Sequence, residues 1–300
     1  MIYKKIIPNR HLRLTILRKL EWIPDTCMIY LQYWIHTGRI LSFKNPKRYT
    51  EKIQHYKCFY RNLDMKRCVD KYEVREYLKE RGFEKYLNKL YGVYNSVFDI
   101  NFDLLPQSFV IKTTDGGGNT GVFICRDKNS IKKQNIIDKF GSLIDNGKKS
   151  PGREWAYYGI KRQIIVEQLL INNDRPNIDI DDYKFLCFNG KVKYIWIDID
   201  RNICHKRNFY DTNWKKIDVE CEYPTSDKNI TPPPMLSEMI DLAEKLSKDF
   251  PHVRVDLYNV NHKIIFGELT FYSSSGYTSF IPDNFDFELG KLFDTKYIQQ

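Results

Sequence analysis

The sequence predicts a protein of the α+β class, because helical and strand-like patterns occupy different stretches of the chain. Residues 51–90 are rich in Glu, Lys, Tyr and Leu at helical spacing, which predicts helices there. From about Ser108 the pattern changes to short runs that are typical of strands. Several of these runs are joined by short turns, so we expect antiparallel hairpins. Helices and antiparallel strands in separate stretches are typical of α+β folds.

Length and composition indicate a globular protein with a substantial core. The chain has 300 residues, of which 42% are hydrophobic and 15% aromatic. A chain of this length is expected to divide into two or three subdomains. Seven scattered cysteines without a C-x-x-C pair argue against a disulfide framework or a cysteine zinc site, and favour reduced thiols. No apolar run approaches the roughly 20 residues that span a bilayer, and no signal-peptide core is present, so we expect a cytoplasmic protein.

The net charge of +10 is compatible with nucleic acid, anionic lipid or anionic substrates as partners. Lysines and arginines are spread along the whole chain, and no zinc-finger or RNA-recognition signature is present, so we expect no nucleic-acid partner. Residues 4–22 combine basic and apolar side chains. One interpretation is a peripheral helix at the inner, cytoplasmic face of a membrane. The commoner interpretation is a helix packed on its own domain with solvated lysines.

The first α+β part contains a glycine-rich turn between two predicted strands. Helical spacing over residues 70–78 predicts a helix that ends near Gly82. Residues 109–112 and 122–126 predict strands, and the turn between them contains Gly116, Gly117 and Gly118. Glycines let backbone N–H groups approach a phosphate closely, and Lys112 on the first strand adds a positive charge. The turn is neither a Walker A loop nor a Rossmann fingerprint, and an ordinary turn is the alternative.

Further along the chain, we expect a helix around residues 131–145 and a buried strand over residues 162–170 whose polar end can hold the edge of a base. Residues 182–188 and 191–198 flank Asn189-Gly190, the strongest hairpin signal in the chain. Lys184 shares a strand face with Leu186 and Phe188. It is therefore either a functional charge inside a cleft or, in the more ordinary interpretation, a lysine on an edge strand.

An acidic hairpin is predicted after an amphipathic helix at residues 236–250. The strands 254–258 and 266–270 each carry one carboxylate, Asp256 and Glu268. If Asn259 pairs with Lys263 across a three-residue loop, Asp256 lies opposite Phe266 and Glu268 is its diagonal neighbour, about 7–8 Å away. A two- or four-residue loop would place the carboxylates on opposite faces. The expected apolar face consists of Val253, Val255, Leu257, Ile265, Leu269 and Phe271.

Two carboxylates on one face of a sheet suit Mg²⁺, which takes one or two carboxylates from protein and its other ligands from water and phosphate. The alternative is an ordinary amphipathic hairpin with a solvated outer face. The choice between them depends on whether the rest of the chain supplies contacts to a nucleotide.

The order of these parts resembles the ATP-grasp superfamily and, more narrowly, the TupA-like ATP-grasp proteins. The resemblance is carried by residues 45–54, 70–77, 109–112, 182–185, 253–258 and 266–272. It implies an ATP-grasp fold of two α+β subdomains that grip ATP. Residues 1–65 would then be a helical N-terminal region, residues 66–170 the N-terminal and flap subdomains, and residues 171–300 the C-terminal metal- and nucleotide-binding subdomain.

The resemblance also implies roles for individual residues in binding ATP. Lys71 and Lys112 are similar to the two lysines that clamp the phosphates, and the loop of Gly116, Gly117 and Gly118 is similar to the flap that closes over them. The strand end with Glu167, Gln168 and Leu169 is similar to the segment that lies beside adenine. The flap departs from the His-Gly-x-Gly form expected for this group.

At the metal, the resemblance implies that Asp256 and Glu268 are the carboxylate ligands. Thr270 stands where many ATP-grasp ligases have Asn, and its hydroxyl can bind metal or water. Lys184 is similar to a further phosphate-facing lysine and is a candidate catalytic residue. Arg254 is our candidate for stabilising an acylphosphate, because its planar fork can hold two oxygens at once.

The implied function is that of an ATP-dependent carboxylate–amine ligase that uses ATP and Mg²⁺ and forms an amide through an acylphosphate. Its partners would be a carboxylate acceptor and an amine, and TupA-like proteins suggest a uronic acid of a surface polysaccharide as the acceptor. Residues 272–277 are either the acceptor loop or a flexible turn. A sugar kinase on the same scaffold and a non-catalytic basic partner of a glycosyltransferase remain as alternatives, whereas a Ser or Cys hydrolase lacks its motif.

Overall fold

A computed structural model describes residues 9–116, 121–141, 149–174, 176, 180–199 and 204–295. The chain divides into two compact units. The first unit contains residues 1–62, 149–155 and 181–300, and the second contains residues 63–148 and 156–180. The first unit is therefore assembled from three separate stretches of sequence. The three-part division expected from the sequence, with boundaries after residues 65 and 170, stays a prediction.

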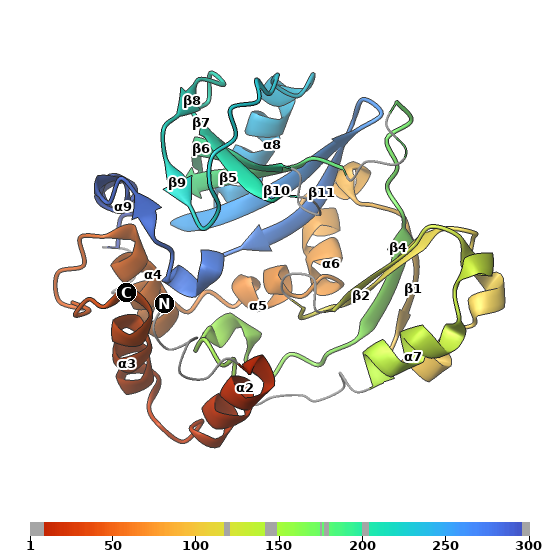
Figure 1. Ribbon diagram of the computed structural model, residues 1–300, viewed down its shortest axis with the longest axis horizontal. Coiled ribbons are helices and arrows are strands. Elements are labelled where there is room, and N and C mark those ends of the chain that lie inside the picture. Colours follow the sequence, from red (N-terminus) through yellow and green to blue (C-terminus); the bar gives the residue numbers. More distant parts are fainter. Residues whose placement is uncertain are drawn as a thin grey trace. The chain divides into compact units, whose positions relative to one another are not determined.

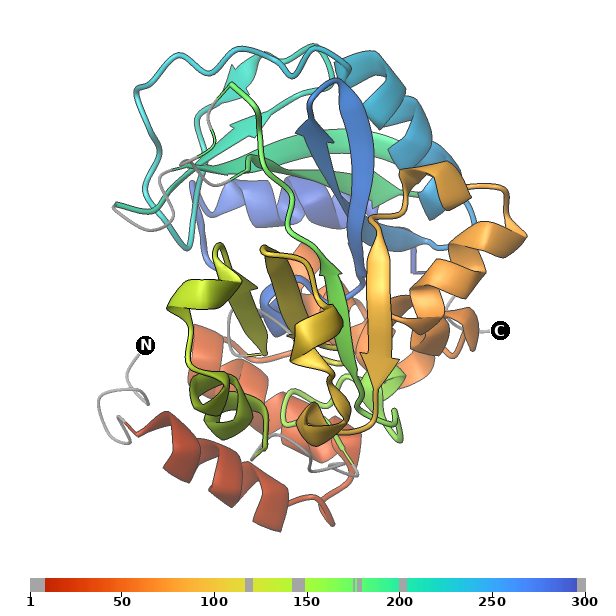
Figure 2. The same cartoon turned by 90° about the vertical axis from the view of Figure 1, so that its right-hand side faces the viewer.

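The second unit is built on a four-stranded antiparallel sheet with the strand order β1-β4-β2-β3 (Figure 2). Its strands and helices are α5 (Asp64–Val69), α6 (Glu73–Glu80), β1 (Leu90–Tyr94), β2 (Phe109–Thr113), β3 (Val122–Cys125), α7 (Lys133–Gly141) and β4 (Ile164–Gln168). Ile136 and Phe140 of α7 pack with Phe109, Ile111 and Val166 of the sheet in a buried apolar cluster. This packing gives the sheet one covered face.

The predicted elements of the second unit are largely confirmed. Gly82 follows α6 with a φ of 77°, and its N–H donates to the carbonyl of Lys79, as expected for a residue that ends a helix. Asp70 stabilises the start of this helix, because its side chain accepts hydrogen bonds from the N–H groups of Tyr72 and Glu73. The helix predicted over residues 131–145 is found at Lys133–Gly141, so it begins two residues later than predicted, and residues 142–145 lie outside the described residues.

The first unit is built on a six-stranded antiparallel sheet with the order β11-β10-β5-β6-β7-β8 (Figure 1). Its strands are β5 (Asp182–Phe188), β6 (Lys191–Ile199), β7 (Lys206–Tyr210), β8 (Lys216–Ile217), β10 (His252–Val260) and β11 (Lys263–Thr270). Helix α8 (Leu236–Ser247) packs against β5, β6 and β10 through its buried side chains, which include Met239 and Leu242. The other face of this sheet carries the polar residues described below.

Helices from both ends of the chain meet in the first unit. These are α2 (Arg10–Lys19), α3 (Asp25–Thr37), α4 (Tyr49–Phe59) and α9 (Asn284–Leu292). Buried Asp286 of α9 accepts hydrogen bonds from the backbone N–H and the hydroxyl of Thr50, at 2.9 and 2.8 Å. A carboxylate at the N-terminus of α4 is favourable, because it meets unpaired N–H groups and the positive end of the helix dipole.

The remaining elements are short. Strands β9 (Glu220–Cys221) and β12 (Phe280–Ile281) pair in a small antiparallel ladder. The 3₁₀ helices are η1 (Glu84–Tyr86), η2 (Val97–Asp99), η3 (Phe102–Leu104), η4 (Lys128–Ser130), η5 (Trp155–Tyr157) and η6 (Ser273–Gly276). Among the helices of the described residues, none is long and apolar enough to span a bilayer.

The hairpin of β10 and β11 corrects the predicted register. Val260 pairs with Lys263 across a two-residue loop, and Asp256 does not lie opposite Phe266. On a regular ladder this loop would put Glu268 on the opposite face from Asp256. A β-bulge intervenes, because Leu257 pairs with Phe266 while Asp256 pairs with Glu268, which leaves Gly267 as the extra residue. The two carboxylates therefore share a face as expected, but as direct partners and for a different reason.

The bulge also changes the apolar face of this hairpin. Ile265 was predicted to lie on it, but Ile265 pairs with Tyr258, which is on the same face as Asp256. Phe266 takes its place opposite Leu257 and is buried. The prediction failed at this one position because the bulge restores the expected alternation only beyond Gly267.

The hairpin of β5 and β6 confirms the turn at Asn189-Gly190 and corrects the ordinary interpretation of Lys184. Both turn residues have positive φ, 50° and 72°, which a two-residue hairpin turn of this kind requires. Strand β5 lies between β10 and β6, so Lys184 is on a central strand and is buried. The register shifts at Lys193, and as a result Trp196 pairs with Lys184.

Candidate functional site

The paired carboxylates of the first unit are joined by Arg254. Its Nε and Nη2 atoms each lie 2.6 Å from an oxygen of Asp256, which is the two-pronged geometry that makes Arg–carboxylate contacts strong. The same Nη2 donates to Oε1 of Glu268 at 2.9 Å. The strand alternation explains this arrangement, because Arg254 and Asp256 lie two residues apart on one strand and so share a face. One guanidinium therefore bridges both candidate metal ligands.

Thr270 completes this corner of the sheet. Its hydroxyl accepts a hydrogen bond from Nη2 of Arg254 at 3.0 Å and donates one to Oε1 of Glu268 at 2.8 Å. The hydroxyl oxygen is thus held next to the second carboxylate, on the same face. Three oxygen-bearing side chains, from Asp256, Glu268 and Thr270, converge on the Arg254 guanidinium.

Lys184 lies beside this group and contacts three carboxylates, those of Asp256, Asp182 and Asp198. Its Nζ is 3.4 Å from Oδ2 of Asp256 and 3.8 Å from Oδ2 of Asp198, and it donates a short hydrogen bond to Asp182. Asp182 and Asp198 were not among the residues expected from the sequence. Asp182 was detectable, because it precedes Lys184 by two residues on an alternating strand. Asp198 was not, because the bulge at Lys193 decides its face.

The same face continues across β6 and β7. Arg207 donates from Nε to Oδ1 of Asp198 at 2.7 Å and from Nη1 to Oε2 of Glu222 at 2.9 Å. The guanidinium carbons of Arg207 and Arg254 lie 5.0 and 5.3 Å from the ring centroid of Trp196, within the range of cation–π contacts. We refer to this surface as the polar face, which comprises Asp182, Lys184, Trp196, Asp198, Arg207, Arg254, Asp256, Glu268 and Thr270.

Burial shapes the protonation of the polar face. It raises the pKa of Asp256 to about 6, although the positive charges of Arg254 and Lys184 oppose this shift. Burial also disfavours the charged form of Arg254, but Asp256 and Glu268 outweigh it and raise the pKa of the guanidinium. Arg254 therefore stays charged, whereas Asp256 is a carboxylate that favours a nearby cation.

The donor set of this corner fits Mg²⁺. Asp256, Glu268 and Thr270 offer only oxygen atoms, the ligands that this hard cation prefers. The four acidic and three basic side chains of the polar face leave a formal charge of −1, which an added cation would balance. Across the described residues, no cluster of three or more His, Cys, Asp or Glu side chains is arranged as a metal site. Mg²⁺ bound to nucleotide does not need one, because water and phosphate supply its other ligands.

In the second unit, Glu167 orients Lys112. Oε2 of Glu167 lies 2.8 Å from Nζ of Lys112, and Oε1 lies 2.9 Å from Nη1 of Arg75. Arg75 also donates to the carbonyl of Asn88 at 2.5 Å, which ties α6 to the start of β1. Glu167 is buried, whereas Lys112 is only half-buried, so the carboxylate holds the ammonium group at the border of the sheet. The sequence did not point to Arg75 as the second partner.

Lys71 lies where the glycine-rich turn begins. Its N–H donates to the carbonyl of Thr114 at 2.8 Å, and its Nζ donates to the carbonyl of Gly116. A Cβ atom at Gly116 would come within 2.4 Å of the Thr113 hydroxyl, so a larger residue does not fit there without a shift. Gly117 and Gly118 lie outside the described residues. The structure thus brings Lys71 to the first residue of the predicted flap.

A family comparison decides what kind of chain carries these two groups. A sequence profile described as TupA-like ATPgrasp matches residues 51–294, most of the chain. The chain belongs to the TupA-like ATP-grasp family. This confirms the resemblance and the α+β ATP-grasp fold predicted from the sequence.

Solved structures similar to this TupA-like ATP-grasp chain are remote in sequence. D-alanine–D-alanine ligase from Bacillus anthracis is 20% identical with a TM-score of 0.42, over 68% of this chain and 57% of that one. A RimK domain ATP-grasp protein from Sphaerobacter thermophilus is 9% identical with a TM-score of 0.40, over 82% and 69%. Phosphoribosylamine–glycine ligase from Thermotoga maritima is 12% identical with a TM-score of 0.42, over 69% and 48%.

Comparison with curated proteins found no match. The chain covers less than two thirds of the length of the Bacillus anthracis ligase. The activity and substrates of this TupA-like ATP-grasp protein are therefore matters for the proposal below.

Each unit of this TupA-like ATP-grasp chain gathers one part of the predicted site. The polar face of the first unit brings together Lys184, Arg254, Asp256, Glu268 and Thr270. In the second unit, Lys71 and Gly116 meet at the end of β2, and Lys112 meets Glu167 across β2 and β4. Gln168 is exposed at the end of β4 and Leu169 is buried directly after it. The roles of these residues toward ATP and metal stay predictions.

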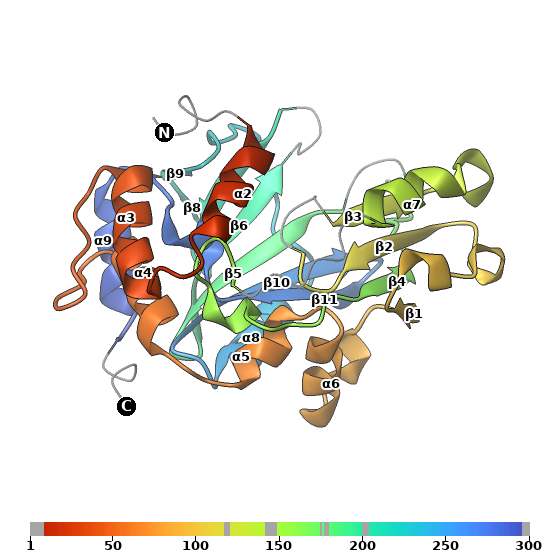
Figure 3. The same ribbon diagram turned by 90° about the horizontal axis from the view of Figure 1, so that it is seen from below.

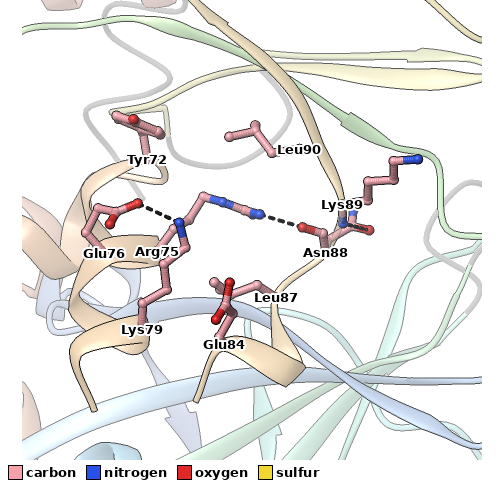
Figure 4. A pocket seen from close by; sticks show the side chains of 9 residues that line it. All are labelled: Tyr72, Arg75, Glu76, Lys79, Glu84, Leu87, Asn88, Lys89 and Leu90. Carbon is pink, nitrogen blue, oxygen red and sulfur yellow. Dashed lines mark hydrogen bonds and ion pairs between the residues drawn. The ribbon is translucent and has the colours of Figure 1, made fainter. Parts of the chain in front are cut away.

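A cavity of about 350 Å³ lies in the second unit, apart from the predicted site residues (Figure 4). Arg75 crosses it toward Asn88, and Lys79 pairs with Glu76 on its wall. Its lining consists of Tyr72, Arg75, Glu76, Lys79, Glu84, Leu87, Asn88, Lys89 and Leu90. Arg75, which pairs with Glu167, lines this cavity, but none of the predicted phosphate or metal residues does.

Proposed function

We propose that this protein is an ATP-dependent carboxylate–amine ligase that forms an amide through an acylphosphate. We further propose that it attaches an amino acid or another amine to a uronic-acid-containing sugar in the synthesis of a surface polysaccharide. The observation that carries the proposal is the Arg254 guanidinium held between Asp256, Glu268 and Thr270 on one sheet face. Membership of the TupA-like ATP-grasp family supports it.

The reaction has two balanced steps. In the first, an oxygen of the acceptor carboxylate attacks the γ-phosphorus of ATP, a P–O bond forms, the bond to the bridging oxygen breaks, and ADP leaves. In the second, the amine nitrogen attacks the acyl carbon, a C–N bond forms, the C–O bond to phosphate breaks, and the nitrogen loses a proton. Neither step needs a covalent nucleophile from the protein, so charge neutralisation and alignment are the main tasks.

The charged side chains perform the charge neutralisation and alignment. Arg254 can hold two oxygens of the acylphosphate at once, because its guanidinium is planar and stays charged. Lys184, Lys112 and Lys71 are assigned to the phosphates as positive charges. Mg²⁺ held by Asp256, Glu268 and Thr270 would neutralise phosphate charge as a Lewis acid. The Glu167 carboxylate keeps Lys112 in a fixed position, which lowers the cost of ordering that lysine when phosphate binds.

Residues 272–277 are our candidates for the acceptor loop. They follow β11 directly, and Ser274, Ser275 and Gly276 all have positive φ, between 48° and 68°. Such conformations are costly for serine, and they occur most often at functional sites, where the surrounding structure imposes them. Buried Lys57 supports this conformation, because its Nζ donates to both the carbonyl and the hydroxyl of Ser275.

The decisive experiment is product analysis. Purified protein is incubated with ATP, Mg²⁺, a panel of uronic acids and a mixture of amino acids, and the products are identified by mass spectrometry. The proposal predicts ADP release that requires both an acid and an amine, and an amide product. A phosphate ester formed without amine would make the protein a kinase. The absence of any nucleotide affinity would identify a non-catalytic partner protein.

A further inference from the structure

Helix α3 is apolar on two opposite sides. Its inner side, with Met28, Ile29, Gln32 and Tyr33, is buried. Its outer side carries an unbroken row that we call the outer stripe, namely Cys27, Tyr30, Leu31, Trp34 and Ile35, all of which are exposed. The spacing i, i+3, i+4, i+7, i+8 is that of a single helix face. Leu31 and Trp34 expose 46% and 58% of their surface.

Helix α8 of the same unit shows what an ordinary outer side looks like in this protein. It also packs one apolar side on the core, including Met239 and Leu242. Its exposed positions, however, are polar throughout: Ser237, Glu238, Asp241 and Lys245. A helix that is apolar on two opposite sides is normally covered on both of them. The outer stripe of α3 therefore has the composition of a contact surface.

Further exposed apolar side chains lie beyond both ends of α3. Trp22 precedes the helix and is 78% exposed, and Ile40 follows it and is 87% exposed. Leu12 and Ile16, four residues apart on α2, are exposed as well. Helix α2 precedes α3 in the first unit, and residues 20–24 connect the two helices (Figures 1 and 3). Trp and Tyr are the side chains most enriched where a protein meets the headgroup region of a bilayer, and this region exposes Trp22, Tyr30 and Trp34.

The charge of this region selects an anionic partner. Residues 1–40 contain seven lysines and arginines and two acidic residues, which is half of the net charge of the chain. Arg18 and Lys19 are exposed in the last turn of α2, which contains no acidic residue. One of the two acids, Asp25, is compensated by Lys149 and Arg153, each 3.0 Å away. Basic charge beside exposed Trp, Leu and Ile is the pattern of a helix that lies in an anionic membrane interface.

We propose that the outer stripe of α3, together with α2, docks on an anionic bilayer, with α3 lying along the surface. A second copy of the chain is the competing occupant, but two-fold pairing would bring the same basic flanks of both copies together. Anionic headgroups instead neutralise these flanks while the tryptophans enter the interface. The inference goes beyond the ligase proposal and does not depend on it.

Vesicle co-sedimentation tests the proposal with the full chain. We expect binding to phosphatidylcholine vesicles that contain phosphatidylglycerol, little binding to phosphatidylcholine alone, and weaker binding as salt is raised. Trp34→Gln or Leu31→Gln should each weaken binding by about tenfold, because a bulky apolar side chain that leaves water contributes about this factor. Leu104→Gln is the matched control, since Leu104 is 82% exposed in the second unit. It should bind like the unchanged protein.

Charge is tested separately with the double variant Arg18→Glu, Lys19→Glu, and Lys263→Glu serves as an exposed control on β11. Of these two charge variants, only the double variant should lose binding to the anionic vesicles. Circular dichroism establishes that each variant is folded. The proposal is overturned if the unchanged protein fails to sediment with anionic vesicles or if the control variants lose as much binding. A dimer in sedimentation velocity that Trp34→Gln disrupts would equally overturn it and assign the stripe to a second copy.

Discussion

Arg254 is the residue on which the candidate metal corner depends. It is the group through which Asp256, Glu268 and Thr270 meet, and it keeps its charge in a buried position. Its proposed partner in the reaction is an acylphosphate, whose two oxygens match the same fork that now holds the carboxylate of Asp256. A lysine at this position would keep the charge but lose the fork.

We therefore predict that Arg254→Lys lowers kcat by about 100-fold, the effect typical of losing one preorganised donor to a developing charge. Binding of ATP should change much less than kcat, because lysine retains the positive charge. Steady-state kinetics and nucleotide titration measure the two quantities. A variant with unchanged kcat would remove Arg254 from the reaction. Lys191→Arg, on an exposed ion pair with Glu244, is the control and should leave kcat unchanged.

Lys57 offers a test of the loop that follows β11. Its ammonium group is buried and donates to the carbonyls of Gly152 and Ser275 and to the side chain of Gln54. Burial lowers the pKa of Lys57 to about 8 from the ordinary value of 10.5. Between these two values the unfolded chain binds a proton that the folded chain does not. Unfolding therefore takes up a proton, and the free energy of unfolding rises with pH.

We predict that this rise amounts to on the order of 3 kcal/mol between about pH 8 and pH 10.5, and that Lys57→Met abolishes it. Urea denaturation at a series of pH values measures the free energy of unfolding for both proteins. The difference between them isolates Lys57, because other groups titrate alike in both. Lys263→Met, at an exposed position, should keep the wild-type slope. If the free energy of unfolding depended on pH in the same way for the wild type and Lys57→Met, the buried charge of Lys57 would not destabilise the folded protein.

Among the elements, the two hairpins show what the sequence could and could not predict. Alternation and the Asn-Gly turn located β5 and β6 almost to the residue, whereas the predicted strands 254–258 and 266–270 cover only part of β10 and β11. Each hairpin then contains one extra residue, Lys193 or Gly267, that moves half of the ladder by one position. Side-chain periodicity does not reveal such a shift, because the residues on both sides of the bulge still alternate. Asp198 was missed and Ile265 was misplaced for this reason.

The direct pairing of Asp256 with Glu268 was not predicted, but their shared face was, since a three-residue loop and a two-residue loop with a bulge both place the carboxylates on one face. Lys184, Arg254 and Thr270 were predicted from alternation and from family resemblance. Arg75 could not be, because its contact with Glu167 joins helix α6 to strand β4, 92 residues apart. Contacts between distant elements depend on tertiary packing that local pattern does not encode.

The bulge at Gly267 can be tested directly. A Cβ atom there would lie 2.9 Å from the carbonyl oxygen of Asp256 and 3.1 Å from Cε2 of Tyr258. We predict that Gly267→Ala destabilises the protein by about 1–3 kcal/mol, the usual cost of overpacking, and weakens Mg²⁺-dependent nucleotide binding. Gly141→Ala at the end of α7 is the control, since no heavy atom lies within 4 Å of the added Cβ. Equal melting temperatures for the two variants would contradict the role assigned to the bulge.

In the molecule as a whole, distant parts of the sequence build each of the two units. The first unit combines the N-terminal helices, the segment 149–155 and the C-terminal half of the chain. Asp286, near the C-terminus, accepts a hydrogen bond from the N–H of Thr50 at the start of helix α4, near the N-terminus. Arg153 of the middle segment donates to the carbonyl of Leu20 at 2.7 Å. The polar face is thus carried by a sheet in a unit that three separate stretches of the chain assemble. Its rigidity supports a site of charged groups that need fixed positions.

Calorimetric titration of ATP with and without Mg²⁺ tests the central claim, that Asp256 and Glu268 together hold a nucleotide-bound cation. The unchanged protein should bind ATP more tightly with Mg²⁺ than with a chelator. In the double variant Asp256→Asn, Glu268→Gln, this difference should vanish while circular dichroism shows an intact fold. The pair Glu238→Gln, Asp241→Asn on the exposed side of α8 is the control and should keep the difference. A double variant at the polar face whose ATP affinity still depends fully on Mg²⁺ would contradict the account.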